Sequence, residues 1–268
     1  MTGIPVVRLN DGADMPVVGL GTWQMHGQQA YDAVRWALTA GYRHIDTATM
    51  YKNEAEVGRA VRDSGVDRGE LFITTKLPPG NAGRERQTLA DSLEALGTGF
   101  VDLWLIHWPP RRKGVSERVW RAFLELQAEG LCRAVGVSNY SPAQIDELAA
   151  ATGQTPAVNQ VPWSPSGHDA GLLAAHRERG VVLEGYSPLK GWRPSAGGRG
   201  GQRGLGNPEL VSIAAAHGVT AAQVVLRWHV QMGIVVIPKS AHRERIESNL
   251  DLFGFELTDA EMERLPNL

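Results

Sequence analysis

Four side chains that can hold or transfer a proton lie at or near the ends of short apolar runs in the sequence. Asp46, Lys76 and His107 each stand at the end of such a run, and Tyr51 follows Asp46 by five residues. A phenol has an ordinary pKa of about 10 and is a poor proton donor at neutral pH, but a nearby ammonium stabilises the phenolate and lowers that pKa. We therefore expect Lys76 to activate Tyr51 as a general acid, and Asp46 to hold Lys76 in place.

His107 completes this set, because an imidazole can donate a hydrogen bond to a carbonyl oxygen and orient it. A general acid beside a polarised carbonyl is what the reduction of an aldehyde or ketone requires. A hydride source is still needed, and side chains cannot supply one. Each residue also has an interpretation without chemistry: Asp46 suits a turn, Lys76 a solvated surface and His107 a structural position. Their joint occurrence favours a catalytic site.

The elements that must position these residues are eight apolar runs, most of them rich in β-branched residues, that alternate with helical patterns. The runs span residues 17–22, 42–47, 71–76, 101–107, 134–139, 157–161, 181–187 and 234–240. The helical patterns span residues 28–40, 54–62, 84–96, 116–128, 142–150, 170–179, 207–217, 221–230 and 243–250. This alternation predicts an α/β fold, a (β/α)₈ TIM barrel, whose chemistry lies where the strands end.

The rival architecture is a doubly wound open sheet, which carries GxGxxG after its first strand. The segment Gly19-Leu20-Gly21-Thr22-Trp23-Gln24 lacks the third glycine, so the barrel is favoured. Val6–Asn10 and Met15–Val17, joined by Asp11-Gly12, predict an N-terminal β-hairpin before the barrel.

Residues 190–206 are rich in glycine and arginine and predict a loop after the seventh strand. A disordered insertion and a loop that closes over ligand remain equally open interpretations of this segment. No break in composition marks a second domain, so we expect residues 1–268 to form a single barrel domain.

Composition excludes several classes of protein. Lys and Arg number 27 against 29 Asp and Glu, so there is no basic excess to hold nucleic acid. Cys132 is the only cysteine, which rules out an intramolecular disulfide and suits a reducing compartment. No apolar run approaches the roughly 20 residues that span a membrane, and the start lacks the pattern of a secretory signal. We expect a cytoplasmic protein without a membrane or nucleic-acid partner.

Beyond these physical arguments, ordered motifs of the sequence resemble those of the aldo-keto reductases. They are GLGTW (19–23), GYRHIDTAxxYxNE (41–54), Thr75-Lys76, IHWP (106–109), GVSN (136–139), NQ (159–160), YSPL (186–189) and IPKS with Arg245 and Asn249 (237–249). The resemblance runs from Val6 to about Leu265 and is strongest to the bacterial 2,5-diketogluconate reductase branch. It implies a catalytic tetrad of Asp46, Tyr51, Lys76 and His107, with Tyr51 as the acid, in an NADPH-dependent reductase that is commonly a monomer.

The resemblance also assigns residues to the cofactor. The cofactor is bordered by Gly21, Thr22, Trp23 and Asp46, its nicotinamide carboxamide is bound by Ser138, Asn139 and Gln160, and its nicotinamide ring stacks on Tyr186. The pyrophosphate lies near Ser187 and Leu189. The 2′-phosphate is bound by Lys239, Ser240 and Arg245, and the adenine contacts Asn249. Two cations and a hydroxyl suit a phosphate better than a bare ribose, which favours NADPH over NADH. The alternative is that Lys239 and Arg245 merely flank the start of a helix.

The substrate pocket implied by the resemblance is lined by Trp23, Tyr51, His107 and Trp108. Met50, Trp163 and Trp192 are further candidates, with core or loop packing as the alternative. Apolar walls around one polar end suit small carbonyl compounds such as aldehydes, α-dicarbonyls and keto sugars.

Three departures from the family pattern bear on these expectations. Val161-Pro162-Trp163-Ser164-Pro165 replaces the usual continuation after Gln160, and Ser248 replaces a common Glu or Gln beside Asn249. The sequence also ends at Leu268, where many relatives carry a further loop, so we expect an open pocket with broad selectivity.

Other functions on the same fold remain as alternatives. An NADP(H)-binding sensor or regulatory subunit would suit an altered tetrad, whereas the tetrad here is complete. A barrel lyase would use Lys76 as a Schiff base, but it needs a neutral amine, and Asp46 with Tyr51 should keep Lys76 charged. A metal-dependent hydrolase built on His44 and Asp46 lacks further histidines arranged as ligands.

Overall fold

The computed structural model describes residues 3–112, 114–189 and 204–268, and within them eight parallel strands follow one another in chain order in a single sheet. The strands are β3 (Leu20–Gly21), β4 (His44–Asp46), β5 (Phe72–Leu77), β6 (Val101–Ile106), β7 (Cys132–Ser138), β8 (Val158–Pro162), β9 (Val182–Tyr186) and β10 (Val235–Val236). A parallel bridge pairs Val18 with Val236, and Gly19 N donates to the Val236 carbonyl at 2.9 Å. These contacts join the first strand to the last, and the predicted (β/α)₈ barrel is confirmed.

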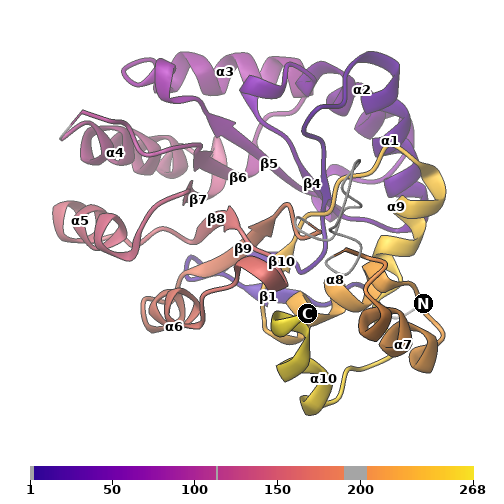
Figure 1. The fold of residues 1–268 in the computed structure, drawn as a ribbon. Coiled ribbons are helices and arrows are strands. Elements are labelled where there is room, and N and C mark those ends of the chain that lie inside the picture. Colours follow the sequence, from indigo (N-terminus) through magenta and orange to yellow (C-terminus); the bar gives the residue numbers. More distant parts are fainter. Residues whose placement is uncertain (1–2, 113, 190–203) are drawn as a thin grey trace.

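Helices surround the strands, as Figure 1 shows. They are α1 (Gly27–Ala40), α2 (Glu54–Ser64), α3 (Glu85–Leu96), α4 (Val115–Ala128), α5 (Pro142–Thr152), α6 (Ala170–Glu178), α7 (Pro208–His217), α8 (Ala221–Gln231), α9 (Arg243–Leu250) and α10 (Asp259–Arg264). Short 3₁₀ helices are η1 (Thr49–Tyr51), η2 (Arg68–Glu70), η3 (Pro79–Asn81), η4 (Pro165–Gly167) and η5 (Leu265–Asn267). The nine predicted helices all form, whereas α10 was not predicted.

Local sequence signals explain where several of these helices begin and end. Ser141 caps α5 in a reciprocal capping box with Gln144, and Pro142 occupies the first turn. Gly41 ends α1 in the left-handed conformation, at a φ of 107°, which glycine adopts without steric cost. The first strand of the barrel can therefore turn into a helix and return to the second strand within a short stretch of chain.

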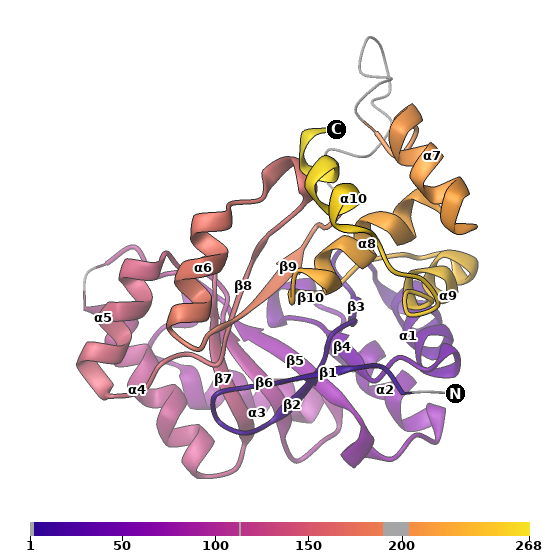
Figure 2. The ribbon, with the colours of Figure 1, turned by 90° about the horizontal axis from the view of Figure 1, so that it is seen from below.

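The predicted hairpin is formed by β1 (Val6–Arg8) and β2 (Asp14–Pro16), which pair antiparallel. Its turn reaches the start of β8, where Asn10 Nδ2 donates to the Pro156 carbonyl at 3.1 Å. Seen from below in Figure 2, the indigo hairpin lies across the barrel. The hairpin therefore contacts the end where strands begin and leaves the opposite end, the mouth, to the loops that follow the strands.

The core fills the space between the strands and the helices. Trp104 on β6 stacks on Phe123 of α4 with ring centroids 3.8 Å apart, and Cys132, at the start of β7, is 1% exposed within the same cluster. No single helix among the described residues is long and apolar enough to cross a membrane; α7 and α8 meet the length and composition criteria only as a pair bent by 81°. Most of the predicted loop 190–206 lies outside the described residues.

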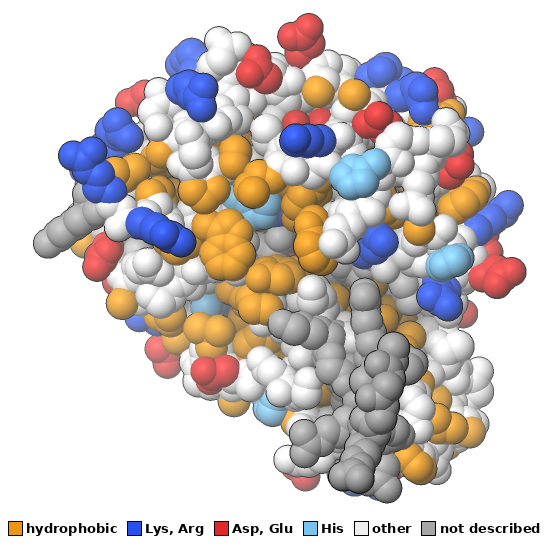
Figure 3. Space-filling model, turned by 45° about the horizontal axis from the view of Figure 1, so that its top comes forward, with side chains coloured by type: hydrophobic (Ala, Val, Ile, Leu, Met, Phe, Trp, Pro, Cys, Tyr) orange, Lys and Arg blue, Asp and Glu red, His pale blue; other side chains and the backbone are white. Residues whose placement is uncertain are grey.

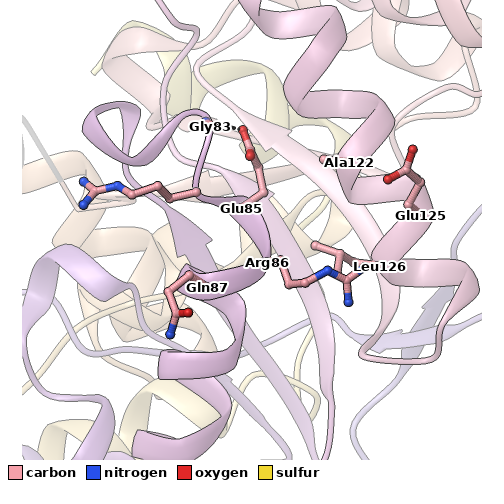
Figure 4. Close-up of a pocket in the computed structure, with 8 residues that line it drawn as sticks. Gly83, Glu85, Arg86, Gln87, Ala122, Glu125 and Leu126 are labelled. Carbon is pink, nitrogen blue, oxygen red and sulfur yellow. Dashed lines mark hydrogen bonds between the residues drawn. The ribbon is translucent and has the colours of Figure 1, made fainter.

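A hollow of about 390 Å³ lies in the outer layer between α3 and α4. Figure 4 shows its lining, which comes from Gly83–Gln87 and from Ala122, Glu125 and Leu126 of α4. None of the predicted site residues lines this hollow, so its presence does not bear on them.

Candidate active site

Parallel pairing carries the predicted proton-transfer residues to the mouth of the barrel. Asp46 is the last residue of β4, Lys76 precedes the last residue of β5, and His107 directly follows β6. Tyr51 lies in the short helix η1, which is tied to the end of β5 because Thr49 Oγ1 donates to the Lys76 carbonyl at 3.0 Å. The structure therefore brings together all four residues of the predicted tetrad.

Lys76 is completely buried, and its ammonium group donates hydrogen bonds inside the barrel. Its Nζ donates to both carboxylate oxygens of Asp46 at 2.7 Å and to the Thr47 carbonyl at 2.8 Å. Burial opposes the charge on the ammonium, but the adjacent Asp46 and Tyr51 favour that charge and raise the pKa of Lys76 above its usual value. Lys76 is therefore a fixed cation. A proton-donor site requires this charge, whereas a Schiff-base lysine must be a neutral amine.

Tyr51 Oη lies 3.5 Å from Lys76 Nζ, and the ammonium is 5.1 Å from the centre of the phenol ring. Burial raises the pKa of Tyr51, and the charge of Lys76 lowers it by less, so the net direction is upward. Lys76 does lower the pKa of Tyr51, as expected. The expectation of a net lowered pKa is wrong, because burial disfavours the phenolate more than the ammonium favours it. At neutral pH Tyr51 is consequently a protonated phenol.

His107 stands beside Tyr51 with ring centroids 5.8 Å apart and an interplanar angle of 76°. Burial and the neighbouring Lys76 lower the pKa of His107 to about 3, so its imidazole is neutral. Its Nδ1 is buried and bonds to no group among the described residues. A neutral imidazole has one N–H donor, and the ring of His107 lies next to the Tyr51 phenol.

Gln160 on β8 lies between two buried carboxyl groups, an arrangement that sequence reasoning missed. Its Nε2 donates to Asp46 Oδ2 at 2.7 Å and to Glu184 Oε2 at 2.8 Å. Glu184, on β9, is completely buried, and its Oε1 lies 3.6 Å from His44 Nε2 on β4. A carboxylate within the apolar run 181–187 was the one sequence signal that pointed to Glu184.

Three of the residues expected to bind nicotinamide form one hydrogen-bonded group at the ends of β7 and β9. Asn139 Nδ2 donates to the His107 carbonyl at 3.1 Å and to Ser138 Oγ at 2.9 Å, and Tyr186 donates to Asn139 Oδ1 at 3.0 Å. Asn139 and Ser187 have left-handed backbones, with φ of 64° and 54°. Both residues directly follow strands that end at the mouth, so the chain turns sharply at these positions.

Gly21 and Thr22 have structural roles of their own at this end of the barrel. A Cβ on Gly21 would lie 2.9 Å from the Ile237 carbonyl oxygen, so only glycine permits the first strand to approach the last. Thr22 is fully buried, and its Oγ1 donates to the Asp46 carbonyl at 2.9 Å. Gly21 thus lets the barrel close, and Thr22 holds the strand that ends in Asp46.

The residues expected to hold the 2′-phosphate gather at the start of α9. Lys239 and Arg245 are exposed, whereas Ser240 and Asn249 are buried. The N-cap residue His242 makes no side-chain cap, and Arg245 is in the first turn, where a cation is unfavourable beside the positive end of the helix. Cationic and hydroxyl donors thus gather at the positive end of a helix, and this donor set fits a phosphate. Leu189, expected near the pyrophosphate, is partly buried.

Apolar side chains gather in the middle of one face of the molecule, with a histidine among them, as Figure 3 shows. The large apolar side chains exposed on loops after β3, β4 and β6 are Trp23 (55%), Met50 (55%) and Trp108 (46%). Trp163 is 2% exposed and packs in a core cluster with Trp228, so its candidacy for the pocket is wrong and the packing alternative holds. Trp192 lies outside the described residues.

Comparison with known proteins places the chain in one family. The model of the aldo/keto reductase family matches residues 17–268. A morphine 6-dehydrogenase from Pseudomonas putida is 44% identical over 269 residues, covering 98% of this chain and 91% of that protein. A 2,5-diketo-D-gluconic acid reductase B from a Corynebacterium species is 42% identical over 270 residues, covering 100% of this chain and 94% of the relative.

Solved structures agree with the sequence comparison. An aldo/keto reductase from Brucella melitensis superimposes with a TM-score of 0.91 at 39% identity, covering 98% of this chain and 99% of the other. An aldo-keto reductase from Bombyx mori, solved in complex with NADP, gives a TM-score of 0.91 at 31% identity, covering 100% and 93%. The chain therefore belongs to the aldo/keto reductase family and is an NADP-dependent oxidoreductase.

Proposed function

We propose that this oxidoreductase reduces aldehydes and ketones to alcohols with Tyr51 as the proton donor, using NADPH. The observation that carries the proposal is the position of Lys76, whose Nζ holds Asp46 at 2.7 Å and lies 3.5 Å from the Tyr51 hydroxyl. A fixed ammonium next to a protonated phenol supports transfer of the phenol proton, because the phenolate left behind is stabilised by that charge.

The residues at the ends of the later strands would hold the cofactor. Ser138, Asn139 and Gln160 would bind the carboxamide, Tyr186 would stack on the ring, and Lys239, Ser240 and Arg245 would bind the 2′-phosphate. Ser187 and Leu189 would contact the pyrophosphate, Asn249 the adenine, and Trp23 and Asp46 the nicotinamide. When bound, NADPH supplies the hydride that no side chain can provide.

The remaining chemistry belongs to the tetrad. His107 donates its N–H to the substrate carbonyl oxygen and so fixes that oxygen beside Tyr51. As the carbonyl carbon accepts the hydride, the Tyr51 O–H bond breaks and its proton passes to the oxygen, leaving an alcohol and a phenolate. Lys76 stabilises that phenolate, and Asp46 keeps Lys76 charged and in position.

The rim of the mouth supports carbonyl substrates with an apolar or aromatic body. Trp23, Met50 and Trp108 are each about half exposed there, so an apolar substrate would cover surface that now meets water. One relative is named for morphine and another for a diketo sugar acid, at 44% and 42% identity. Substrates of both kinds, together with α-dicarbonyls and aromatic aldehydes, therefore belong in the first panel.

The test follows the absorbance of NADPH, and separately of NADH, against that panel with the wild type and Tyr51→Phe. Loss of the proton donor should lower kcat by about 10²–10⁴-fold. Binding of NADPH, measured by fluorescence, should be retained in the variant. Equal turnover by Tyr51→Phe would refute the role of Tyr51, and tight NADPH binding without turnover across the panel would favour a sensor.

A further inference from the structure

The buried pair of Gln160 and Glu184 has no part in the proton transfer described above, yet it contacts the tetrad directly. Gln160 Nε2 divides its two N–H bonds between Asp46 and Glu184, at 2.7 and 2.8 Å. On the far side of Glu184, Oε1 faces His44 Nε2 at 3.6 Å. A chain of polar contacts thus crosses the interior of the barrel from β4 through β8 to β9.

The charges in this chain do not balance if every group takes its usual state. Asp46 and Glu184 are two carboxyl groups, and among the described residues the cation bonded to this pair is Lys76, which contacts Asp46. His44 does not supply a second cation, because complete burial lowers its pKa to about 3. An unpaired charge in such a place is strongly unfavourable, so one of the two carboxyl groups must carry a proton.

Hydrogen bonding decides which carboxyl group that is. Asp46 accepts two bonds of 2.7 Å from an ammonium, which stabilise its ionised form. Glu184 accepts one bond at Oε2 from a neutral amide, while its Oε1 accepts no bond within the described residues. A proton on Oε1 would point to His44 Nε2, an acceptor in one tautomer of the neutral imidazole. These hydrogen bonds favour a neutral Glu184 beside an ionised Asp46.

We propose that Glu184 is a positioning residue of the reductase site, a buried neutral carboxylic acid that holds Gln160 against Asp46 and whose ionisation weakens Tyr51 as a proton donor. The proposal rests on the proposed function of the tetrad. Because the amide nitrogen of Gln160 is committed to the two carboxyl groups, Gln160 can meet the nicotinamide carboxamide only through its oxygen, and Glu184 fixes that orientation.

Loss of the Glu184 proton would change the charge of the whole interior. The polar and charged groups around Glu184 are His44 and Asp46 on β4, Lys76 on β5, Gln160 on β8 and Tyr51 in η1. The residue paired with Glu184 on β10 is Val235, which does not titrate. Burial, together with the charge of Asp46, raises the pKa of Glu184 to about 8. A negative Glu184 raises the pKa of Tyr51 further, so the phenol gives up its proton less readily.

The kinetic test compares pH profiles of kcat for the wild type and Glu184→Gln, which keeps an acceptor for Gln160 but cannot ionise. The wild-type kcat should fall as the pH rises through about 8, and the fall should move upward by about one pH unit or more in the variant. Glu54→Gln is the matched control, since Glu54 is a buried carboxyl that accepts from Thr75 at 2.6 Å without contacting Gln160. The same fall in all three proteins would overturn the proposal.

A second measurement is independent of turnover and separates this proposal from the proposed function. Infrared spectra of the protein without substrate should contain the carbonyl band of a protonated carboxyl, and that band should disappear as the pH rises through about 8. Isotopic labelling of glutamate distinguishes Glu184 from Asp46, and the band should persist in Glu54→Gln but not in Glu184→Gln. Absence of a protonated glutamate at neutral pH refutes the proposal even if Tyr51→Phe behaves as expected. A band without turnover refutes only the proposed function.

Discussion

Buried carboxyl groups lie at both ends of the barrel, and the two ends differ in the ratio of cations to carboxyl groups. Where the strands begin, Asp102 on β6 receives Arg68 at 2.7 Å and Arg133 at 3.0 Å, as well as the Ile73 backbone N–H at 2.9 Å. At the mouth, Asp46 and Glu184 have a single Lys76 near them. One end has two cations for one carboxyl group, and the other has two carboxyl groups for one cation.

This difference separates a structural cluster from one that can move a proton. The guanidinium groups stay charged at any accessible pH, and the side chains of Arg68 and Arg133 are 22% and 50% exposed, so water shares in their solvation. Burial raises the pKa of Asp102, the two guanidinium groups oppose that rise, and the carboxyl group ties η2 to β5, β6 and β7. The mouth excludes water from its charges, and Glu184 keeps a proton that an exposed carboxyl group would lose at neutral pH.

The largest expected effect comes from removing Lys76, the buried cation that contacts Asp46. Lys76→Met leaves Asp46 buried without a counterion, which should destabilise the fold by about 3–5 kcal/mol. The same change should lower kcat by about 10²–10⁴-fold because the phenolate loses its partner. Urea denaturation and kinetics measure the two effects. The double variant Asp46→Asn/Lys76→Met should recover stability but not activity; equal stability of the single and double variants would show that Asp46 is not left charged.

A smaller effect is expected where the cations are in excess. Asp102→Asn keeps an acceptor for the Ile73 N–H and leaves Arg68 its bonds to Thr98 and to the Leu71 and Phe100 carbonyls. We expect a loss of about 1–3 kcal/mol in unfolding free energy, with kcat and its pH profile unchanged. A shift in the pH profile would contradict the separation between the two ends.

A third effect, absent at neutral pH, is a dependence of stability on pH that comes from His44. Its pKa in the folded protein is about 3, below the ordinary 6.5, so only the unfolded chain takes up a proton between these values. Stability contributed by the neutral imidazole is present above pH 6.5 and is lost as the pH falls toward 3, by about 1.4 kcal/mol per pH unit. The difference in unfolding free energy between the wild type and His44→Gln should therefore shrink as the pH falls. A constant difference would mean that His44 titrates normally.

Much of the fold follows from the sequence because local patterns and barrel geometry agree. The eight strands and nine helices lie where apolar runs and helical periodicity predict them, and Ser141 and Gly41 mark helix ends as expected. The first and last strands of the barrel were predicted too long, since residues 17–22 and 234–240 contain only the two-residue strands β3 and β10. The short helix α10 was missed because six residues carry little periodic signal.

The tetrad could be predicted because parallel strands end on the same side, whereas contacts across the barrel interior could not. That Gln160 reaches both Asp46 and Glu184 depends on the closed register of β4, β8 and β9, which no local pattern records. The burial that raises the pKa of Tyr51 is likewise a property of the assembled mouth. The monomeric state and cytoplasmic location stay predictions.

The position of the single cysteine has a practical consequence for measuring how the barrel opens. Cys132 is 1% exposed at the start of β7, paired with Val101 of β6, and burial raises its pKa to about 12. A thiol reagent can react at one sulfur per molecule, and only after that part of the core has separated and the thiolate can form. The labelling rate of the natural protein therefore reports how often the core around Cys132 opens, without an engineered probe.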